Sequence, residues 1–219
     1  DSTNKVYSTD TNVNWKFNTG IITHSLVAGF NLTREEYELE VGGYTYNADG
    51  TVATRTPMNV YNPQHVYTGP NNYFKTADTT GSQDTKSIYV FDTIGLHSML
   101  DLNVGVRYDN VDGTTKTTNY DPATKVVTVV APQNNRDDMM SYNAALVFKP
   151  VDKSSVYVSY ANAKTPSKAS VNGSCTDSNT VTNGVKQNNQ NCNVDPESAE
   201  TYEIGGKWQP NDNLLLTAA

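Results

Sequence analysis

Apolar and polar residues alternate with a period of two along much of the chain. In the stretch 100–109 the even positions carry Leu100, Leu102, Val104, Val106 and Tyr108. The odd positions carry Asp101, Asn103, Gly105, Arg107 and Asp109. Successive side chains of a strand point to opposite faces, so this pattern predicts a β-strand with one apolar and one polar face. Three ionisable groups cannot lie on the core side of a soluble sandwich, so we expect the polar face to contact water and the apolar face to contact something greasy.

The same alternation predicts a hairpin between Met139 and Ala161, with its turn at 149–153. Similar segments predict further strands over 5–17, 21–39, 84–94, 197–208 and from 213 onward. Four of the intervening connections are short, of about three to five residues, and three are long, of about 25 to 45. Short and long connections alternate strictly, which is typical of outer-membrane β-barrels. We therefore predict an all-β fold, an antiparallel transmembrane β-barrel portion with short periplasmic turns and long extracellular loops.

The position of aromatic residues supports this orientation. Phe17, Phe148 and Trp208 each lie on an apolar face directly before a short turn, at the depth expected of a periplasmic aromatic girdle. Tyr108 and Tyr160 lie on the apolar face toward the long loops. Nothing in a soluble meander would require that placement.

Composition narrows the class of protein further. Only 36% of the residues are hydrophobic, which is low for a soluble core in a chain of 219 residues. The formal net charge of −7 and the sequence pI near 4.9 argue against a nucleic-acid partner. No apolar run approaches the roughly 20 residues of a membrane helix. The chain opens on Asp1 with no signal peptide and stops within an apparent strand, so we expect an excerpt of a longer protein.

Several segments resemble the barrel of TonB-dependent siderophore receptors. They are Tyr89–Ile94, Leu102–Asp109, Tyr142–Pro150, Ser154–Ala161 and Asp195–Trp208. The amino-acid sequences of these segments most resemble the branch of the family that takes up ferric catecholates. The resemblance implies a plugged barrel of about 22 strands in the outer membrane, of which residues 1–219 would supply about eight. It also implies an N-terminal plug domain and a TonB box, neither of which is present in this chain.

On this interpretation the partners are a ferric siderophore, outer-membrane lipid, the receptor's own plug and the TonB complex. Ferric siderophores are bulky, often anionic and aromatic, so cationic and aromatic side chains of the first long loop are natural contacts. The candidates are Arg55, Tyr61, His65, Tyr67, Tyr73 and Lys75. The alternative is that these tyrosines merely pack the loop. A second set is expected to face the lumen and contact the plug or one another: Asp92, Asp101, Arg107, Asp109 and Glu203.

Two cysteines, Cys175 and Cys192, lie in one polar stretch, and we expect a local disulfide that stabilises by roughly 3 kcal/mol. Two free thiols are the alternative. His24 and His97 are expected near the short-turn rim and are given no role. No constellation of nucleophile, base or metal ligands stands out, so we predict neither an enzyme nor a cofactor or metal site.

Two other functions stay open. Eight strands can close on themselves, so the chain could be a small structural or adhesive outer-membrane barrel without transport. It could also be a soluble all-β surface protein.

Overall fold

The computed structural model describes residues 1–44, 46–47, 49–54, 57, 59–63, 73–167, 177–182, 185–190 and 194–219. In these ranges the regular structure is β-strand, and they hold no helix that is long and apolar enough to cross a membrane. The strands are β1 (Ser2–Thr19), β2 (Ile22–Gly43), β3 (Phe74–His97), β4 (Leu100–Tyr120), β5 (Val127–Val129), β6 (Gln133–Phe148), β7 (Ser154–Thr165), β8 (Asp177–Thr182), β9 (Val185–Gln190), β10 (Glu197–Asn211) and β11 (Leu214–Ala218).

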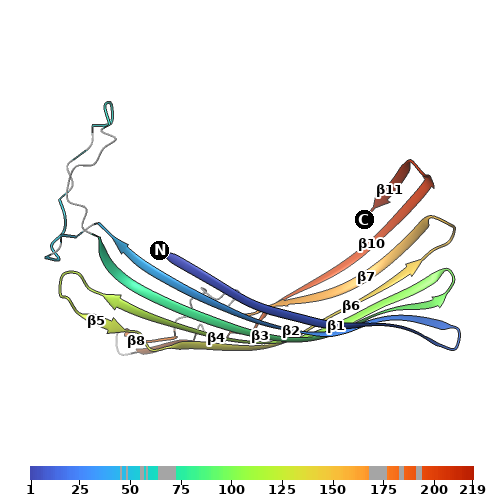
Figure 1. The fold of residues 1–219 in the computed structure, drawn as a ribbon, viewed down its shortest axis with the longest axis horizontal. Coiled ribbons are helices and arrows are strands. Elements are labelled where there is room, and N and C mark those ends of the chain that lie inside the picture. The colour runs from blue at the N-terminus through green and yellow to red at the C-terminus, as the bar shows by residue number, and fades with distance from the viewer. Residues whose placement is uncertain are drawn as a thin grey trace.

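Eight strands form one antiparallel meander in the order β1-β2-β3-β4-β6-β7-β10-β11. β5 pairs with the end of β4, and β8 and β9 pair only with each other. Figure 1 shows a twisted, curved sheet with β1 near one edge and β11 at the other. Within the described residues β1 and β11 do not pair, so these eight strands form an open sheet and not a small closed barrel.

The connections divide between the two ends of the sheet. The short turns at 20–21, 98–99, 149–153 and 212–213 gather at one end, on the right in Figure 1. The connections after β2, β4 and β7 leave from the other end, which confirms the predicted alternation. Gly20 in the first turn has φ +66°, a left-handed conformation that glycine adopts without a Cβ clash.

The strands are longer than the sequence pattern predicts. β3 has 24 residues, Phe74 to His97, where the pattern indicated 84–94. β4 continues to Tyr120 through a stretch that we expected to be loop. Both extensions are polar on both faces, so they carry no alternation, but threonine favours strands and backbone pairing continues. At about 3.3 Å per residue, β3 is far longer than the ~9–11 tilted residues that cross a bilayer.

The register defines two faces of the sheet. Val104 of β4 pairs with Ala144 of β6, and both share a face with Val158 of β7 and Ile204 of β10 through the neighbouring pairs. We call this the apolar face, and its other large members include Val13, Trp15, Phe17, Leu26, Phe30, Val90, Ile94, Leu102, Val106, Leu146 and Trp208. The opposite surface is the polar face.

Burial separates the two faces. In the described part of the chain the buried hydrophobic residues are Tyr37, Val111 and Met139, and the register places all three on the polar face. The apolar face is uncovered, with Val13 66% and Ile204 71% exposed. A sheet of a soluble protein packs its apolar face against another layer, whereas a barrel wall presents it to lipid. The apolar face therefore has the character of a lipid-facing wall.

Candidate functional site

A cluster of paired charges surrounds Lys75 at the long-loop ends of β2, β3 and β4. Lys75 Nζ forms an ion pair with Asp78 and lies 3.4 Å from Glu40 Oε2. It also lies 5.3 Å from the centroid of the Tyr120 ring. Tyr120 donates its O–H to Asp78 Oδ2 at 3.0 Å, and Tyr73 donates to Glu40 Oε1 at 2.9 Å. Lys75 thus has two carboxylates and one aromatic ring as partners within the chain.

An irregularity in the strand register places Lys75 in this cluster. The β2–β3 ladder pairs Val41 with Ala77 and then shifts, so that Gly42 pairs with Lys75. Thr76 is the extra residue, and its Oγ1 donates to the carbonyl oxygen of Val41 at 3.1 Å. Residues three apart in a regular strand point to opposite faces, whereas a bulge lets Lys75 share a face with Asp78. Asp78 lies on the same side of the sheet as the apolar face, but at this long-loop end that side carries charged and polar residues.

The contacts shift the pKa values within this cluster. The hydrogen bond to Asp78 raises the pKa of Lys75, and the same contact lowers the pKa of Asp78. Hydrogen bonding to Glu40 raises the pKa of Tyr73, and hydrogen bonding to Asp78 raises the pKa of Tyr120. Both tyrosines therefore stay protonated donors while the lysine and the aspartate stay charged. The lysine is held by its neighbours and is not a free cation for an anionic ligand.

The structure brings together only part of the predicted ligand set. Tyr73 and Lys75 lie in this cluster, whereas Tyr61 lies apart in the first long connection and is 99% exposed. The backbone N–H of Tyr61 donates to Asn59 Oδ1 at 2.9 Å, and its ring has no aromatic or hydrogen-bond partner among the described residues. Other predicted residues lie outside the described part of the chain: Arg55, His65 and Tyr67, and the expected disulfide partners Cys175 and Cys192.

The prediction that Asp92 accompanies the other lumen-facing residues is wrong. Asp92 pairs with Leu26 on β2 and with Val104 on β4, so it lies on the apolar face. Tyr89 and Phe91 occupy the polar face of β3 instead. The pattern misled because alternate aromatic residues look like a lipid-facing set, although here their rings lie over glycines of neighbouring strands.

The other four residues of that set lie on the polar face. Asp101 accepts a hydrogen bond from Lys149 Nζ at 2.5 Å across the β4–β6 end. Glu203 on β10 accepts a hydrogen bond from the hydroxyl group of Tyr157 on β7. Each carboxylate thus has a partner within the wall.

Arg107 contacts several residues of the polar face. Its Nε donates to both carboxylate oxygens of Asp109, at 2.9 and 3.0 Å, and its Nη2 donates to Ser87 Oγ at 2.8 Å. The guanidinium also lies 5.9 Å from the centroid of the Tyr89 ring. The Asp109 side chain is only 14% exposed and Ser87 2% exposed, so the ion pair is partly shielded from water.

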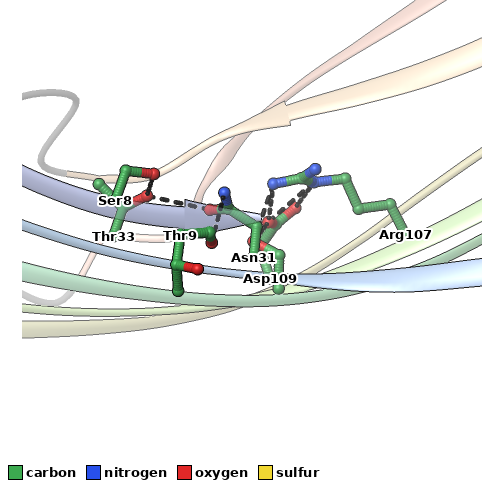
Figure 2. Close-up of polar contacts among 7 residues, drawn as sticks. Ser8, Thr9, Asn31, Thr33, Arg107 and Asp109 are labelled. Atoms are coloured by element: carbon green, nitrogen blue, oxygen red, sulfur yellow. Dashed lines mark hydrogen bonds and ion pairs between the residues drawn. The ribbon is translucent and has the colours of Figure 1, made fainter. Parts of the chain in front are cut away.

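The hydrogen-bonded surface continues across β2 to β1, as Figure 2 shows. Thr33 Oγ1 donates to Asn31 Oδ1 at 3.0 Å, and Asn31 Nδ2 donates to the carbonyl oxygen of Thr9 at 3.2 Å. We call the whole set the polar belt: Ser8, Thr9, Asn31, Thr33, Ser87, Arg107 and Asp109. Thr9 contributes only its backbone carbonyl oxygen, because it pairs with Leu32 and its side chain lies on the apolar face. Of the other six, the sequence pattern pointed only to Arg107 and Asp109, because uncharged residues of a polar strand face carry no distinguishing pattern.

A buried carboxylate lies beside the belt. Asp137 on β6 is 5% exposed and accepts from Ser167, from the backbone N–H at 3.0 Å and from Oγ at 2.8 Å. Ser167 follows β7, so the third long connection begins by contacting the polar face. The sequence could have indicated Asp137 only if β6 had been predicted to begin at Gln133.

These arrangements are suited to hydrogen bonding between neighbouring strands. Within the described ranges no group of three or more His, Cys, Asp or Glu side chains could hold a metal ion. The belt consists of two hydrogen-bonded groups on neighbouring strands, adjacent through the backbone pair of Asn31 and Ser87, and together they form a polar wall.

The chain matches the family described as TonB dependent receptor-like, β-barrel, over residues 1–219. The catecholate siderophore receptor Fiu of Escherichia coli K12 is 29% identical over 240 residues, which cover all of this chain and 29% of Fiu. A probable TonB-dependent siderophore receptor of Acinetobacter baumannii, PiuA, is 33% identical over 143 residues, 65% of this chain and 18% of PiuA. The chain therefore spans less than a third of these relatives.

Solved structures agree in fold. The closed form of Fiu superposes with a TM-score of 0.78 at 24% identity, over 99% of this chain and 30% of that chain. PiuA of Acinetobacter baumannii gives a TM-score of 0.71 at 25% identity, over 99% of this chain and 31% of that chain.

Proposed function

This chain belongs to the TonB dependent receptor-like β-barrel family, and on that basis we propose that it forms part of the wall of an outer-membrane receptor that takes up a ferric siderophore of the catecholate class. The observation that carries the proposal is the match to a catecholate siderophore receptor along the whole chain. Residues 1–219 would be a partial barrel domain. The plug and the contact with the TonB complex would belong to other parts of the receptor.

We place the short turns in the periplasm and the long connections outside the cell. The exposed apolar face lies between the two ends of the sheet, as a lipid-facing band would, and outer-membrane barrels have short periplasmic turns and longer extracellular loops. Toward the long connections, the rings of Tyr142, Tyr160 and Tyr202 form a ladder on the apolar face, with centroids 5.9 and 4.9 Å apart. Aromatic ladders of this kind suit the depth of lipid headgroups.

The polar face would then line the lumen. Arg107 and Asp109 already neutralise each other, so the polar belt offers a plug surface hydrogen-bond partners without a net charge. Asp101 and Glu203 would border the same lumen, each already paired within the wall. A wall of this kind would hold a plug through many modest contacts, which allows the plug to rearrange during transport.

Ligand capture is assigned to the extracellular loops. Tyr61 is the best candidate among the described residues because its ring is exposed and unpacked, so it can stack on a catechol ring. Lys75 is a weaker candidate because Glu40 and Asp78 already pair with its charge. Arg55, His65 and Tyr67 remain predictions from the sequence.

Iron uptake tests the proposal. The full-length receptor would be expressed in a strain lacking other siderophore receptors, and uptake of radioactive iron would be measured with a catecholate and with citrate as the chelator. We expect uptake from the catecholate that disappears when TonB is deleted. Uptake that is equal without the receptor, or that survives the loss of TonB, would contradict the proposal.

A pair of neighbouring variants tests the role of Tyr61. Tyr61→Ala should weaken binding of the ferric catecholate several-fold, because a stacked ring contributes about 1 kcal/mol. Val60→Ala is the matched control, since Val60 is 87% exposed in the same loop. Equal affinities of the two variants in a fluorescence-quenching titration would exclude Tyr61 from ligand capture.

A further inference from the structure

A polar group lies within the apolar face near the short turns. His24 Nδ1 is 2.7 Å from Asp92 Oδ2, and Thr19 Oγ1 is 2.8 Å from His24 Nε2. The side chains of His24 and Asp92 are 15% and 13% exposed. Leu26 and Val104 flank Asp92 on the neighbouring strands. Ionisable residues on a lipid-facing surface are costly, and this pair belongs to none of the contacts assigned above.

One oxygen of Asp92 has no donor. Asp92 Oδ1 is buried without a hydrogen-bond partner among the described residues. A neutral His24 would donate from Nδ1 to Asp92 Oδ2 and accept from Thr19, whereas a protonated His24 would donate from both nitrogens. Oδ1 is left unpaired in either state, and the neutral state also leaves a net negative charge. Both conditions call for a donor, preferably a cation, from outside the chain.

Two aromatic rings of β1 lie on the same face, one of them stacked on His24. Phe17 stacks on His24, with ring centroids 4.6 Å apart and an interplanar angle of 5°. The ring centroid of Trp15 lies 4.7 Å from that of Phe17, and Trp15 is 60% exposed. Aromatic faces beside a carboxylate attract ammonium groups by cation–π interaction and by charge. Part of the Asp92 side chain is exposed, and χ2 of aspartate is a soft torsion, so a donor can reach the carboxylate.

We propose that the His–Asp site, formed by Thr19, His24 and Asp92 beside Trp15 and Phe17, binds the primary ammonium of a phosphatidylethanolamine headgroup. The inference rests on the proposed placement of the short turns in the periplasm, which puts the site in the inner leaflet. Thr19 directly precedes the first turn, and Asp92 lies two residue positions further from that turn than His24, or roughly 7 Å along the strand. The ammonium donates a hydrogen bond to Asp92 and offsets its charge.

Lipid retention by the full-length receptor tests the proposal. The receptor would be reconstituted in nanodiscs that contain equal parts of phosphatidylethanolamine, phosphatidylcholine and phosphatidylglycerol, and the bound lipid would be identified by native mass spectrometry. We expect phosphatidylethanolamine to be enriched over phosphatidylcholine, because a quaternary ammonium has no proton to donate. Asp92→Asn should lower that enrichment roughly tenfold.

Two further variants make the test specific. Asp84→Asn removes the same charge from the same face of β3 at its long-loop end, and it should leave the enrichment unchanged. Asp92→Leu matches the apolar neighbours, so it should fold and still lose the preference. No enrichment in the unaltered receptor, or full enrichment in Asp92→Asn and Asp92→Leu, would overturn the proposal, as would a co-purifying polypeptide in place of the lipid.

Iron uptake by the same variants separates the two proposals. Uptake that continues in Asp92→Leu while the lipid preference disappears supports the His–Asp site and leaves the transport proposal intact. Catecholate-dependent uptake without any lipid preference overturns only the His–Asp site. A receptor that does not enter the bilayer overturns both proposals.

Discussion

The two faces of the sheet carry their charges in different surroundings. On the polar face, Arg107 and Asp109 pair with each other, and both form a hydrogen bond with the hydroxyl group of Ser87. On the apolar face, the pair of His24 and Asp92 lies among Leu26 and other aliphatic residues, with one carboxylate oxygen unpaired. The same two-residue alternation builds both faces. The two faces differ in their surroundings, which are polar on one face and apolar on the other. The free-energy cost of a charged side chain therefore depends on whether it occupies an odd or an even position of the strand.

The largest expected effect comes from moving a charge between the faces. Ala144 and Ala145 are adjacent in β6, but Ala144 pairs with Val104 and Ala145 with Asn103, so they lie on opposite faces. Ala144→Arg should destabilise the full-length receptor by about 2–4 kcal/mol, whereas Ala145→Arg should cost well under half of that. Urea unfolding in phospholipid bilayers measures the difference. Equal costs would show that the two faces do not meet different media.

A smaller effect should follow from adding a methyl group to each face. A Cβ on Gly105 would overlap Phe91 and Asn143, which cover the polar face there. A Cβ on Gly206, on the apolar face, would come no closer than 3.5 Å to the carbonyl oxygen of Ser155. Gly105→Ala should therefore cost about 1–3 kcal/mol, and Gly206→Ala should be close to neutral. The same unfolding assay applies, and a larger loss for Gly206→Ala would refute the packing difference.

The smallest effect concerns pH at the long-loop end, outside the membrane-spanning part of the strands. The raised pKa of Lys75 contributes stability below its ordinary pKa, and this is lost as pH rises through the folded value. The lowered pKa of Asp78 contributes stability above its ordinary pKa, and this is lost as pH falls through the folded value. Amide protection at the ends of β2 and β3, corrected for intrinsic exchange, should be greatest between about pH 5 and pH 10.

Lys75→Met provides the comparison for that measurement. It should lower protection inside this pH range and leave the protection of the mid-strand residues of β4 unchanged. Protection that stays the same in Lys75→Met would mean that backbone pairing alone holds the ends of β2 and β3.

The sequence by itself determined the strands that cross the apolar band and the alternation of short and long connections between them, whereas only the strand pairing showed that the meander is open. Alternation was sufficient there because lipid on one side and water on the other impose opposite demands on neighbouring residues. The segments 74–83 and 111–120 carry mostly polar residues on both faces, so their sequence gave no hydrophobic period, and only backbone pairing shows them as strands.

Only the tertiary structure decided which face Asp92 occupies, because Tyr89 and Phe91 resemble lipid-facing residues until the neighbouring glycines place their rings on the polar face. The bulge at Thr76 likewise turns Lys75 toward Glu40, a contact that no spacing in the sequence predicts. Register across strands relates residues that are distant in the chain. The alternation of side chains decides which residues share a face within one strand. The pairing between strands decides which faces of neighbouring strands lie on the same side of the sheet.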